Sequence, residues 1–201
     1  MRESGIRAKA PRRSTRTTDS RHGRPVAGNV LARGFGPAGP DAAWSADITY
    51  VPTAEGWLDL AVVEDLFSRR IVGWAMDGTM TSRLVVDALD MALGRRRPGL
   101  LAHSDRGSQY ASELYRDLLA RHGITCNMSG VAQCWDNAPV ESFFASLKQE
   151  LVHDEQYATR EQARGSIIGY VEAFDNRVRL HSSLGYISPA EFERAHDPNR
   201  P

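Results

Sequence analysis

The sequence is short of cysteine and has no long hydrophobic run. Its 201 residues include only Cys126 and Cys134, without Cys-x-x-Cys spacing or nearby histidines at zinc-finger spacing. We therefore expect two reduced thiols, with no disulfide scaffold and no structural zinc site. No run of about eighteen apolar residues is present for a membrane helix, and no apolar stretch near Met1 resembles a secretory signal. We expect a cytoplasmic protein with no membrane contact.

Lysine is also scarce, because only Lys9 and Lys148 occur among the 25 basic residues. The six histidines are scattered, and none pairs with another at the helical spacing of metal ligands. The length suits one catalytic domain with tails. The composition, 41% hydrophobic and 25% charged, is typical of a soluble globular protein.

Basic charge is concentrated at the N-terminal end. Residues 1–40 hold nine Arg or Lys against two acids, a balance of +7, so the other 161 residues of this neutral chain carry −7. Clustered arginines such as Arg12, Arg13 and Arg16 neutralise phosphates and release counterions, which indicates nucleic acid. On charge alone, a solvated tail is an equal explanation. Residues 1–43, rich in Arg, Gly and Pro, are expected to form an arm and linker.

The remaining sequence predicts a mixed α/β domain. Alternation from Trp44 to Val51 indicates a first strand with Asp47 projecting from its middle. Three antiparallel strands, a helix, a parallel strand, a helix, a strand and terminal helices describe a sheet of the ribonuclease H type with flanking helices. The expected strands are 44–51, 57–67, 70–76, 100–103 and 124–128, and the expected helices are 81–93, 108–122, 137–151, 160–175 and 189–196.

Three acids occupy places that such a sheet can bring together. Asp47 lies in mid-strand, Asp105 follows the strand at 100–103, and Glu141 lies in the first turns of the helix after Asn137. Taken singly, each acid is as easily a helix cap or a solvent-facing side chain. Together they form an all-oxygen site that suits Mg²⁺ or Mn²⁺, and two such ions can catalyse phosphoryl transfer.

Side chains near the acids are candidates for DNA contact. Lys148 lies two helical turns from Glu141 on the same side, where it can reach a phosphate, although an exposed lysine of an amphipathic helix is the alternative. The small residues after Asp105 allow a backbone to approach DNA closely, while Ser108 is equally a helix cap. His103 is more simply a core histidine than a partner of the site. Trp135 can stack on a base or pack its loop.

Five motifs resemble the OrfB-type transposases of bacterial insertion sequences, relatives of the retroviral integrases. The match runs in order from Trp44 to Phe192. The motifs are Trp44-x-x-Asp47-Ile48-Thr49-Tyr50, His103-Ser104-Asp105-x-Gly107-Ser108-Gln109-Tyr110, Trp135-Asp136-Asn137-Ala138-x-x-Glu141-Ser142-Phe143-Phe144, Leu147-Lys148-x-Glu150, and Asn176-x-x-Arg179-x-His181-x-x-Leu184-Gly185-Tyr186-x-Ser188-Pro189.

The resemblance implies a ribonuclease H-like core at 44–155 and a C-terminal helical extension at 156–201. It implies that Asp47, Asp105 and Glu141 bind two Mg²⁺ or Mn²⁺ ions. Water then cleaves one strand at the element's end, and the freed 3′-hydroxyl attacks another phosphodiester. The roles of Asn176, Arg179 and His181 stay open between structure and DNA contact. The expected DNA-binding residues are Lys148, Arg106, Ser108, Gln109, Trp135, Asn137, Arg179, His181, Arg12, Arg13 and Arg16.

The chain departs from its relatives in two places. They usually carry a helix-turn-helix region before a basic linker, and this chain begins close to that linker. We therefore expect a truncated copy or short frame, a partner polypeptide that recognises the element's ends, and a homo-oligomer on DNA in the bacterial nucleoid. Residues 129–133 are less basic than usual. A non-catalytic DNA-binding remnant or regulator is the alternative, and a nuclease that never joins DNA is disfavoured by the C-terminal extension.

Overall fold

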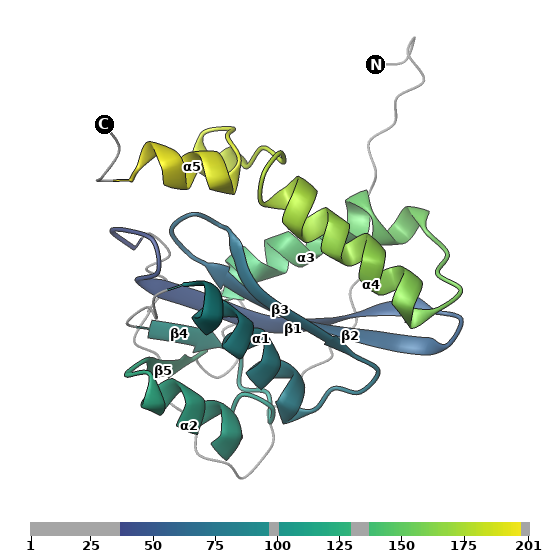
Figure 1. Ribbon diagram of the computed structural model, residues 1–201, viewed down its shortest axis with the longest axis horizontal. Coiled ribbons are helices and arrows are strands. Elements are labelled where there is room, and N and C mark those ends of the chain that lie inside the picture. The colour runs from purple at the N-terminus through teal and green to yellow at the C-terminus, as the bar shows by residue number, and fades with distance from the viewer. Residues whose placement is uncertain (1–36, 97–100, 130–136, 198–201) are drawn as a thin grey trace.

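The computed structural model describes residues 37–96, 101–129 and 137–197, which are built around a five-stranded sheet (Figure 1). The strand order is β3-β2-β1-β4-β5. The first three strands pair antiparallel, and β4 lies parallel to both β1 and β5. This is the predicted mixed sheet, with β1 at its centre. The strands are β1 (Ala43–Thr53), β2 (Gly56–Asp65), β3 (Ile71–Asp77), β4 (Leu101–Ser104) and β5 (Thr125–Met128).

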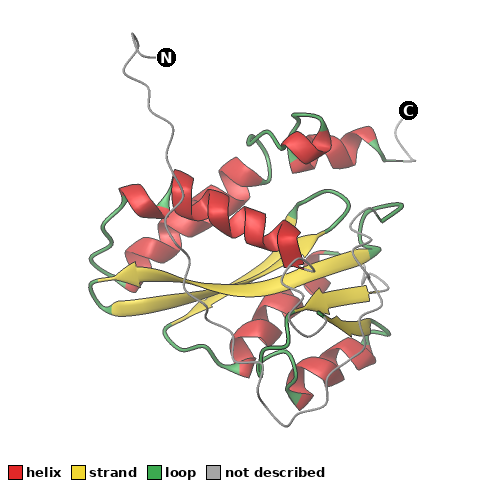
Figure 2. Ribbon diagram, turned by 180° about the vertical axis from the view of Figure 1, so that it is seen from behind, coloured by secondary structure: helices red, strands yellow, loops and turns green. Residues whose placement is uncertain are grey.

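Helices cover both faces of the sheet (Figures 1 and 2). Helices α1 and α2 pack on one face, and α3 and α4 pack on the other. No helix in the described ranges is long and apolar enough to cross a membrane. The α-helices are α1 (Ser82–Arg95), α2 (Glu113–Arg121), α3 (Ala138–Glu150), α4 (Arg160–Ile168) and α5 (Pro189–Ala195), and the short helices are η2 (Val152–Asp154), η3 (Gly169–Asp175) and η4 (Ser182–Leu184).

Strand β2 is apolar along most of its length because both of its faces are covered. Ala61 and Val63 belong to the core under α1 and α2. Leu60 and Val62 belong to the second core, under α3 and α4. Successive side chains of a strand point to opposite faces, so one continuous run of apolar residues supplies both cores.

Some predicted boundaries are wrong. The helix expected from Ser108 begins at Glu113, because Ser112 is its cap and accepts a hydrogen bond from the Tyr115 amide. The second strand ends at Asp65 rather than Phe67, because the Asp65 carboxylate accepts bonds from the Ser68 amide and hydroxyl and closes a turn. The helix expected to reach position 151 ends one residue earlier. The expected strand residue at position 100 lies outside the described ranges.

The C-terminal segment is joined to the sheet through Asn176. Helix α4 continues into the wider turns of η3, so the helical stretch 160–175 ends as predicted. The buried Asn176 side chain then accepts a bond from the Ile71 amide at 2.9 Å and donates one to the Ile71 carbonyl at 3.0 Å. It completes the hydrogen bonding of β3 as a neighbouring strand would, which gives this residue a structural role.

We predict that Asn176→Ala lowers the free energy of unfolding by about 2–4 kcal/mol, because it leaves a buried amide and a buried carbonyl of Ile71 without partners. Urea titration followed by circular dichroism measures the change. The neighbouring Val178→Ala removes an exposed side chain and is expected to cost less than about 0.5 kcal/mol. Equal losses in the two variants would contradict the structural role.

Candidate active site

Parallel pairing of β1 with β4 brings Asp47 beside Asp105. Ala46 of β1 lies in register with Ser104, the last residue of β4. Asp47 is the next residue of β1 and Asp105 directly follows β4, and neighbouring strands lie only about 4.8 Å apart. Two acids that are 58 residues apart in the sequence therefore meet at one edge of the sheet.

Glu141 joins this pair from the first turn of α3. Pro139 stands in that first turn, where it costs no helical hydrogen bond, as predicted. Asn137 precedes the helix and is held against β1, because its side-chain oxygen accepts a bond from the Ser45 hydroxyl at 2.5 Å. This link between helix and strand positions Glu141 over the part of β1 that carries Asp47.

The electrostatic interaction among the three acids is seen in the pKa of Asp47. Burial is the main cause that raises the pKa of Asp47 to about 8, and the charges of Asp105 and Glu141 raise it further. Bonds from the Ile48 amide and from Asn137 oppose the shift. Burial also raises the pKa of Glu141. The charged forms of Asp47 and Glu141 are therefore disfavoured at this site.

Asp105 is fixed by the loop that follows it. Its Oδ1 accepts a hydrogen bond from the Gly107 amide at 2.8 Å. A Cβ at position 107 would lie 2.9 Å from that same oxygen. Glycine at this position thus lets the Asp105 carboxylate lie against the backbone, in addition to the approach of DNA that the sequence predicts.

The chemistry of these residues fits divalent cations. All the donors are carboxylate oxygens, the ligands that Mg²⁺ and Mn²⁺ prefer, and a cation would remove the repulsion at Asp47. Within the described residues, no group of three acid, histidine or cysteine side chains is arranged to hold an ion as it stands. The carboxylates of Asp47 and Asp105 instead accept bonds from the backbone amides of Ile48 and Gly107.

Lys148 lies beside the acids, as its helical spacing from Glu141 predicts. Its ammonium nitrogen is 5.1 Å from the centre of the Tyr50 ring. Burial lowers the pKa of Lys148, and the charge of Asp47 opposes that shift. The amine is therefore held close to Asp47 in a partly dry environment, where a positive charge is most effective.

The other predicted DNA contacts near Asp105 and Asn137 have protein partners. Arg106 donates to the Ser129 carbonyl, and Gln109 donates to the Met80 carbonyl. The Ser108 hydroxyl bonds to the Gln109 side chain, so Ser108 does not cap α2. Asn137 is buried behind Asp47. Contact of these four residues with DNA stays a prediction, while Trp135, Arg12, Arg13 and Arg16 lie outside the described ranges.

Arg179 and His181 lie on the other side of α3. The Arg179 guanidinium donates to Glu150 and to the Ser146 hydroxyl, so it joins the C-terminal segment to α3. The His181 Nε2 atom is 3.6 Å from a carboxylate oxygen of the buried Asp175. These contacts give both residues partners inside the protein, and their contact with DNA stays a prediction.

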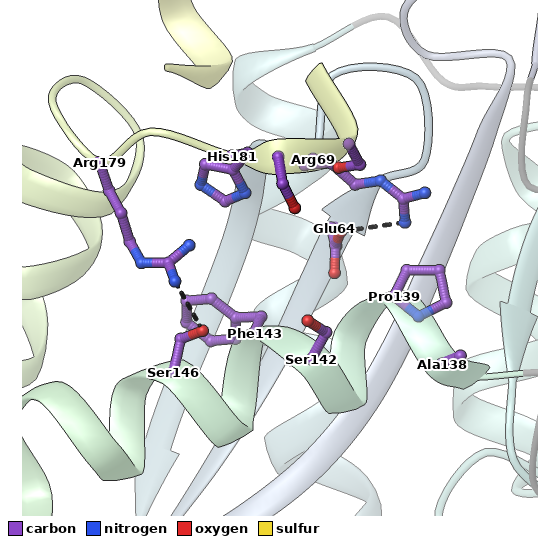
Figure 3. A pocket seen from close by; sticks show the side chains of 11 residues that line it. Glu64, Arg69, Ala138, Pro139, Ser142, Phe143, Ser146, Arg179 and His181 are labelled. Carbon is purple, nitrogen blue, oxygen red and sulfur yellow. Dashed lines mark hydrogen bonds and ion pairs between the residues drawn. The ribbon is translucent and has the colours of Figure 1, made fainter. Parts of the chain in front are cut away.

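A cavity of about 280 Å³ lies between α3 and this segment (Figure 3). Glu64, Ser142, Ser146, Arg179 and His181 are among its lining residues, while the three acids of the site are not. Ser142 and Ser146 lie on a different side of α3 from Glu141 and Lys148. The cavity is therefore separate from the carboxylate site.

The sequence did not reveal two buried acids on this side of the sheet, Glu64 in the wall of the cavity and Asp175 beside His181. Glu64 lies in a strand that reads as apolar, and burial raises its pKa to about 8, although Arg69 opposes the shift at 3.7 Å. Neither carboxylate oxygen of Asp175 has a hydrogen-bond partner in the described structure. Glu64 and Asp175 are 111 residues apart in the sequence and interact only in the folded chain, so no local pattern could have identified them.

Tyr110 is a further residue of the site that the sequence did not single out. Its hydroxyl is fully buried and has no hydrogen-bond partner among the described residues. Burial raises the pKa of Tyr110 far above its ordinary value, and the charges of Asp47 and Asp105 raise it too. The phenol therefore stays a neutral donor close to the acids. His103 is buried between Asn127 and Ser129, which confirms it as a core histidine.

Comparison with known proteins defines the class of this fold. Two family models, both described as integrase core domain, match residues 37–134 and 141–196. A chain of the simian T-cell lymphotropic virus intasome is similar over 92% of this chain and 63% of its own, with a TM-score of 0.68 and 16% identity. The HTLV-2 integrase catalytic core domain in complex with magnesium is similar over 78% and 98%, with a TM-score of 0.59 and 16% identity. The fold is that of the ribonuclease H-like integrase cores.

Closer relatives come from bacteria. Transposase InsF for insertion sequence IS3A of Escherichia coli is 48% identical over 195 residues, which are 96% of this chain and 68% of that protein. The uncharacterized 31 kDa protein of insertion element IS600 of Shigella sonnei is 46% identical over 94% of this chain and 71% of its own. The chain belongs to the IS3 family of insertion-sequence transposases, which confirms the resemblance found in its motifs.

We predict that Asp47→Asn raises the melting temperature in the presence of EDTA, because it removes a carboxylate whose charged form is disfavoured by burial and by the charges of Asp105 and Glu141. Each kcal/mol relieved corresponds to about 2–4 °C for a chain of this size. Mn²⁺ is expected to stabilise the wild type by binding its folded state, and to stabilise the variant much less. Thermal unfolding with and without Mn²⁺ measures both effects. An equal Mn²⁺ shift in both proteins would count against a cation at Asp47.

The Glu64 carboxyl is expected to make stability depend on pH. Its folded pKa of about 8 exceeds the usual 4.5, so between these values the folded state holds a proton that the unfolded state releases. The free energy of unfolding then falls as pH rises through this window, by at most about 1.4 kcal/mol per pH unit from this group. Glu64→Gln should remove that slope, as urea titrations at several pH values can measure. Glu161→Gln, at an exposed acid, should leave the slope unchanged.

Proposed function

We propose that the protein is a DDE transposase, in which Asp47, Asp105 and Glu141 hold two Mg²⁺ or Mn²⁺ ions and carry out cleavage and strand transfer of DNA. The observation that carries the proposal is the register of β1 and β4, which sets Asp47 beside the residue that follows β4. The charges of Asp105 and Glu141 both act on Asp47, as expected of three ligands to shared cations. Membership of the IS3 family supports the same reaction.

Each residue has a distinct task in this proposal. Bound metal would supply a nucleophile and stabilise the leaving oxygen. Asp47 and Asp105 hold the ligand oxygens on two paired strands, and Glu141 brings the third from α3. Lys148 binds a phosphate near the cleaved bond, because its ammonium is held beside Asp47. No covalent bond between protein and DNA is needed, since a hydroxyl or water attacks the phosphorus directly.

The proposed substrates are the ends of an insertion element and a target DNA. The name of the viral relative, an intasome, supports assembly on DNA as a homo-oligomer. The magnesium in the HTLV-2 structure supports the choice of cation. We propose that residues 1–43, with Arg12, Arg13 and Arg16, form an arm that binds phosphates, that 44–155 is the catalytic core and that 156–201 is its extension. A helix-turn-helix region would recognise the ends, and the protein would act at the bacterial nucleoid.

The alternative function is a DNA-binding regulator without catalysis. It is favoured by one observation, which is that the carboxylates of Asp47 and Asp105 accept hydrogen bonds from backbone amides of the protein itself. In that case DNA binding would be independent of divalent cations and of the three acids.

We expect Mg²⁺- or Mn²⁺-dependent nicking and joining of oligonucleotides that carry the element's ends. Asp105→Asn and Glu141→Gln are expected to lower the rate at least about a hundredfold, because each removes a ligand charge and leaves the side-chain volume intact. Gel analysis of labelled strands measures both steps. As a matched control, the exposed Asp87→Asn on α1 should keep wild-type rates. Unchanged rates in the two site variants, or a wild type inactive with both metals, would sink the enzyme assignment in favour of the regulator.

A further inference from the structure

An exposed aromatic side chain lies on the hairpin of β1 and β2, beyond Asp47. Trp57, the second residue of β2, lies opposite Pro52 and is 55% exposed. Its ring meets the Tyr50 ring edge to face, with centroids 4.7 Å apart and an interplanar angle of 76°. Because Tyr50 supports one side of the indole, the pair forms a small aromatic surface open to solvent.

Lys148 connects this surface with the acids. Its ammonium lies over the Tyr50 ring, and it is also within electrostatic reach of Asp47. Tyr50 follows Asp47 by three residues, which is about 10 Å along a strand. On this side β4 pairs only with residues 43–46 of β1, so among the described strands none covers the edge between Asp47 and Tyr50. A side chain from α3 can therefore reach around that edge.

The hairpin that carries Trp57 is held rigidly. Gly56 has a φ of 101°, which the turn between β1 and β2 requires. The Ala54 amide donates to the Tyr157 carbonyl at 2.9 Å. Arg160 of α4 donates from its side chain to the Trp57 carbonyl and from its amide to the Glu55 carboxylate. The aromatic surface is thus set in place before any ligand binds, which lowers the entropic cost of binding.

We propose that Trp57 and Tyr50 form a stacking surface for an unpaired nucleobase of the DNA strand that reacts at the carboxylate site; this rests on the proposed function. An indole face binds any base by stacking, and a neighbouring ammonium binds the phosphate that the base carries. A purely apolar partner would have to desolvate Lys148 without offering it an anion. The distance of about 10 Å from Asp47 to Tyr50 along β1 corresponds to about three stacked nucleotides of DNA. The base therefore belongs to the first three positions beside the cleaved phosphate.

The contact with Tyr50 gives Lys148 a fixed direction. A lysine has four flexible side-chain bonds, and a ring beneath its ammonium restricts them. The aromatic surface then binds the base of one nucleotide, and Lys148 binds its phosphate. Trp57 in this proposal is a positioning residue that holds the end of a DNA strand open, and it takes no part in the chemical step.

The first arm of the test compares two end substrates, one fully paired and one with three mismatched base pairs at the cleavage site. Trp57→Ala is expected to lower cleavage of the paired end about tenfold, since stacking on an aromatic side chain contributes that much or more for each base. The mismatched end is expected to restore most of the rate, because its bases are already unpaired. Trp57→Phe should retain an intermediate rate. Leu114→Ala, which also removes an exposed apolar side chain, should behave as the wild type.

The second arm detects stacking without catalysis. Oligonucleotides with 2-aminopurine at each of the first four positions beside the cleavage site are mixed with protein and Ca²⁺. Stacking on Trp57 is expected to change the fluorescence at one of the first three positions, and Trp57→Ala should abolish the change while circular dichroism shows an intact fold. A change that persists in this variant, or that appears only at the fourth position, overturns the proposal.

The two proposals can fail separately. A wild type that cuts and joins DNA, with Trp57→Ala equal to Leu114→Ala on both substrates, overturns the stacking surface and leaves the transposase assignment intact. Conversely, a wild type that never cuts DNA overturns the transposase assignment. A fluorescence change that depends on Trp57 would in that case support base stacking by a DNA-binding protein.

Discussion

The parallel pairing of β1 with the short strand β4 is the contact on which the rest of the site depends. It sets Ala46 beside Ser104 and so brings the two following aspartates together. Because β4 has only four residues, it leaves the outer part of β1 without a neighbour on that edge among the described strands. The same feature thus creates the acid pair and the open edge that Lys148 crosses toward Tyr50.

Helix α3, which carries Glu141, is held in place at both of its ends. Asn137 holds the start of this helix against β1, and Arg179 holds its end through Glu150. The C-terminal segment therefore supports α3, because it fixes the helix about two turns beyond Glu141. Asn176 in turn fixes that segment to β3. The motif beyond position 175 acts on the site through packing and hydrogen bonds.

Much of the fold could be predicted from the sequence, since its patterns are local. Alternation from Trp44 and helical spacing in α3 predicted the type and order of the elements, and the strand order confirms the mixed sheet. Boundaries failed where a polar side chain competes with the pattern, as Ser112 does at the start of α2 and Asp65 does at the end of β2. Glu64 in β2 and Asp175 in η3 were missed because a local pattern leaves no signal of what each acid faces.

The sequence by itself determined the class of protein. It also led to the proposed chemistry, because the three acids, Lys148 and the motifs around them specify ligand type and order along the chain. Tertiary structure alone decided how these groups meet. The register of two parallel strands and the seating of one helix set which acids interact, and these depend on contacts between residues far apart in sequence. For the same physical reason, only the folded chain shows Trp57 exposed beside Tyr50, the ring over which Lys148 lies.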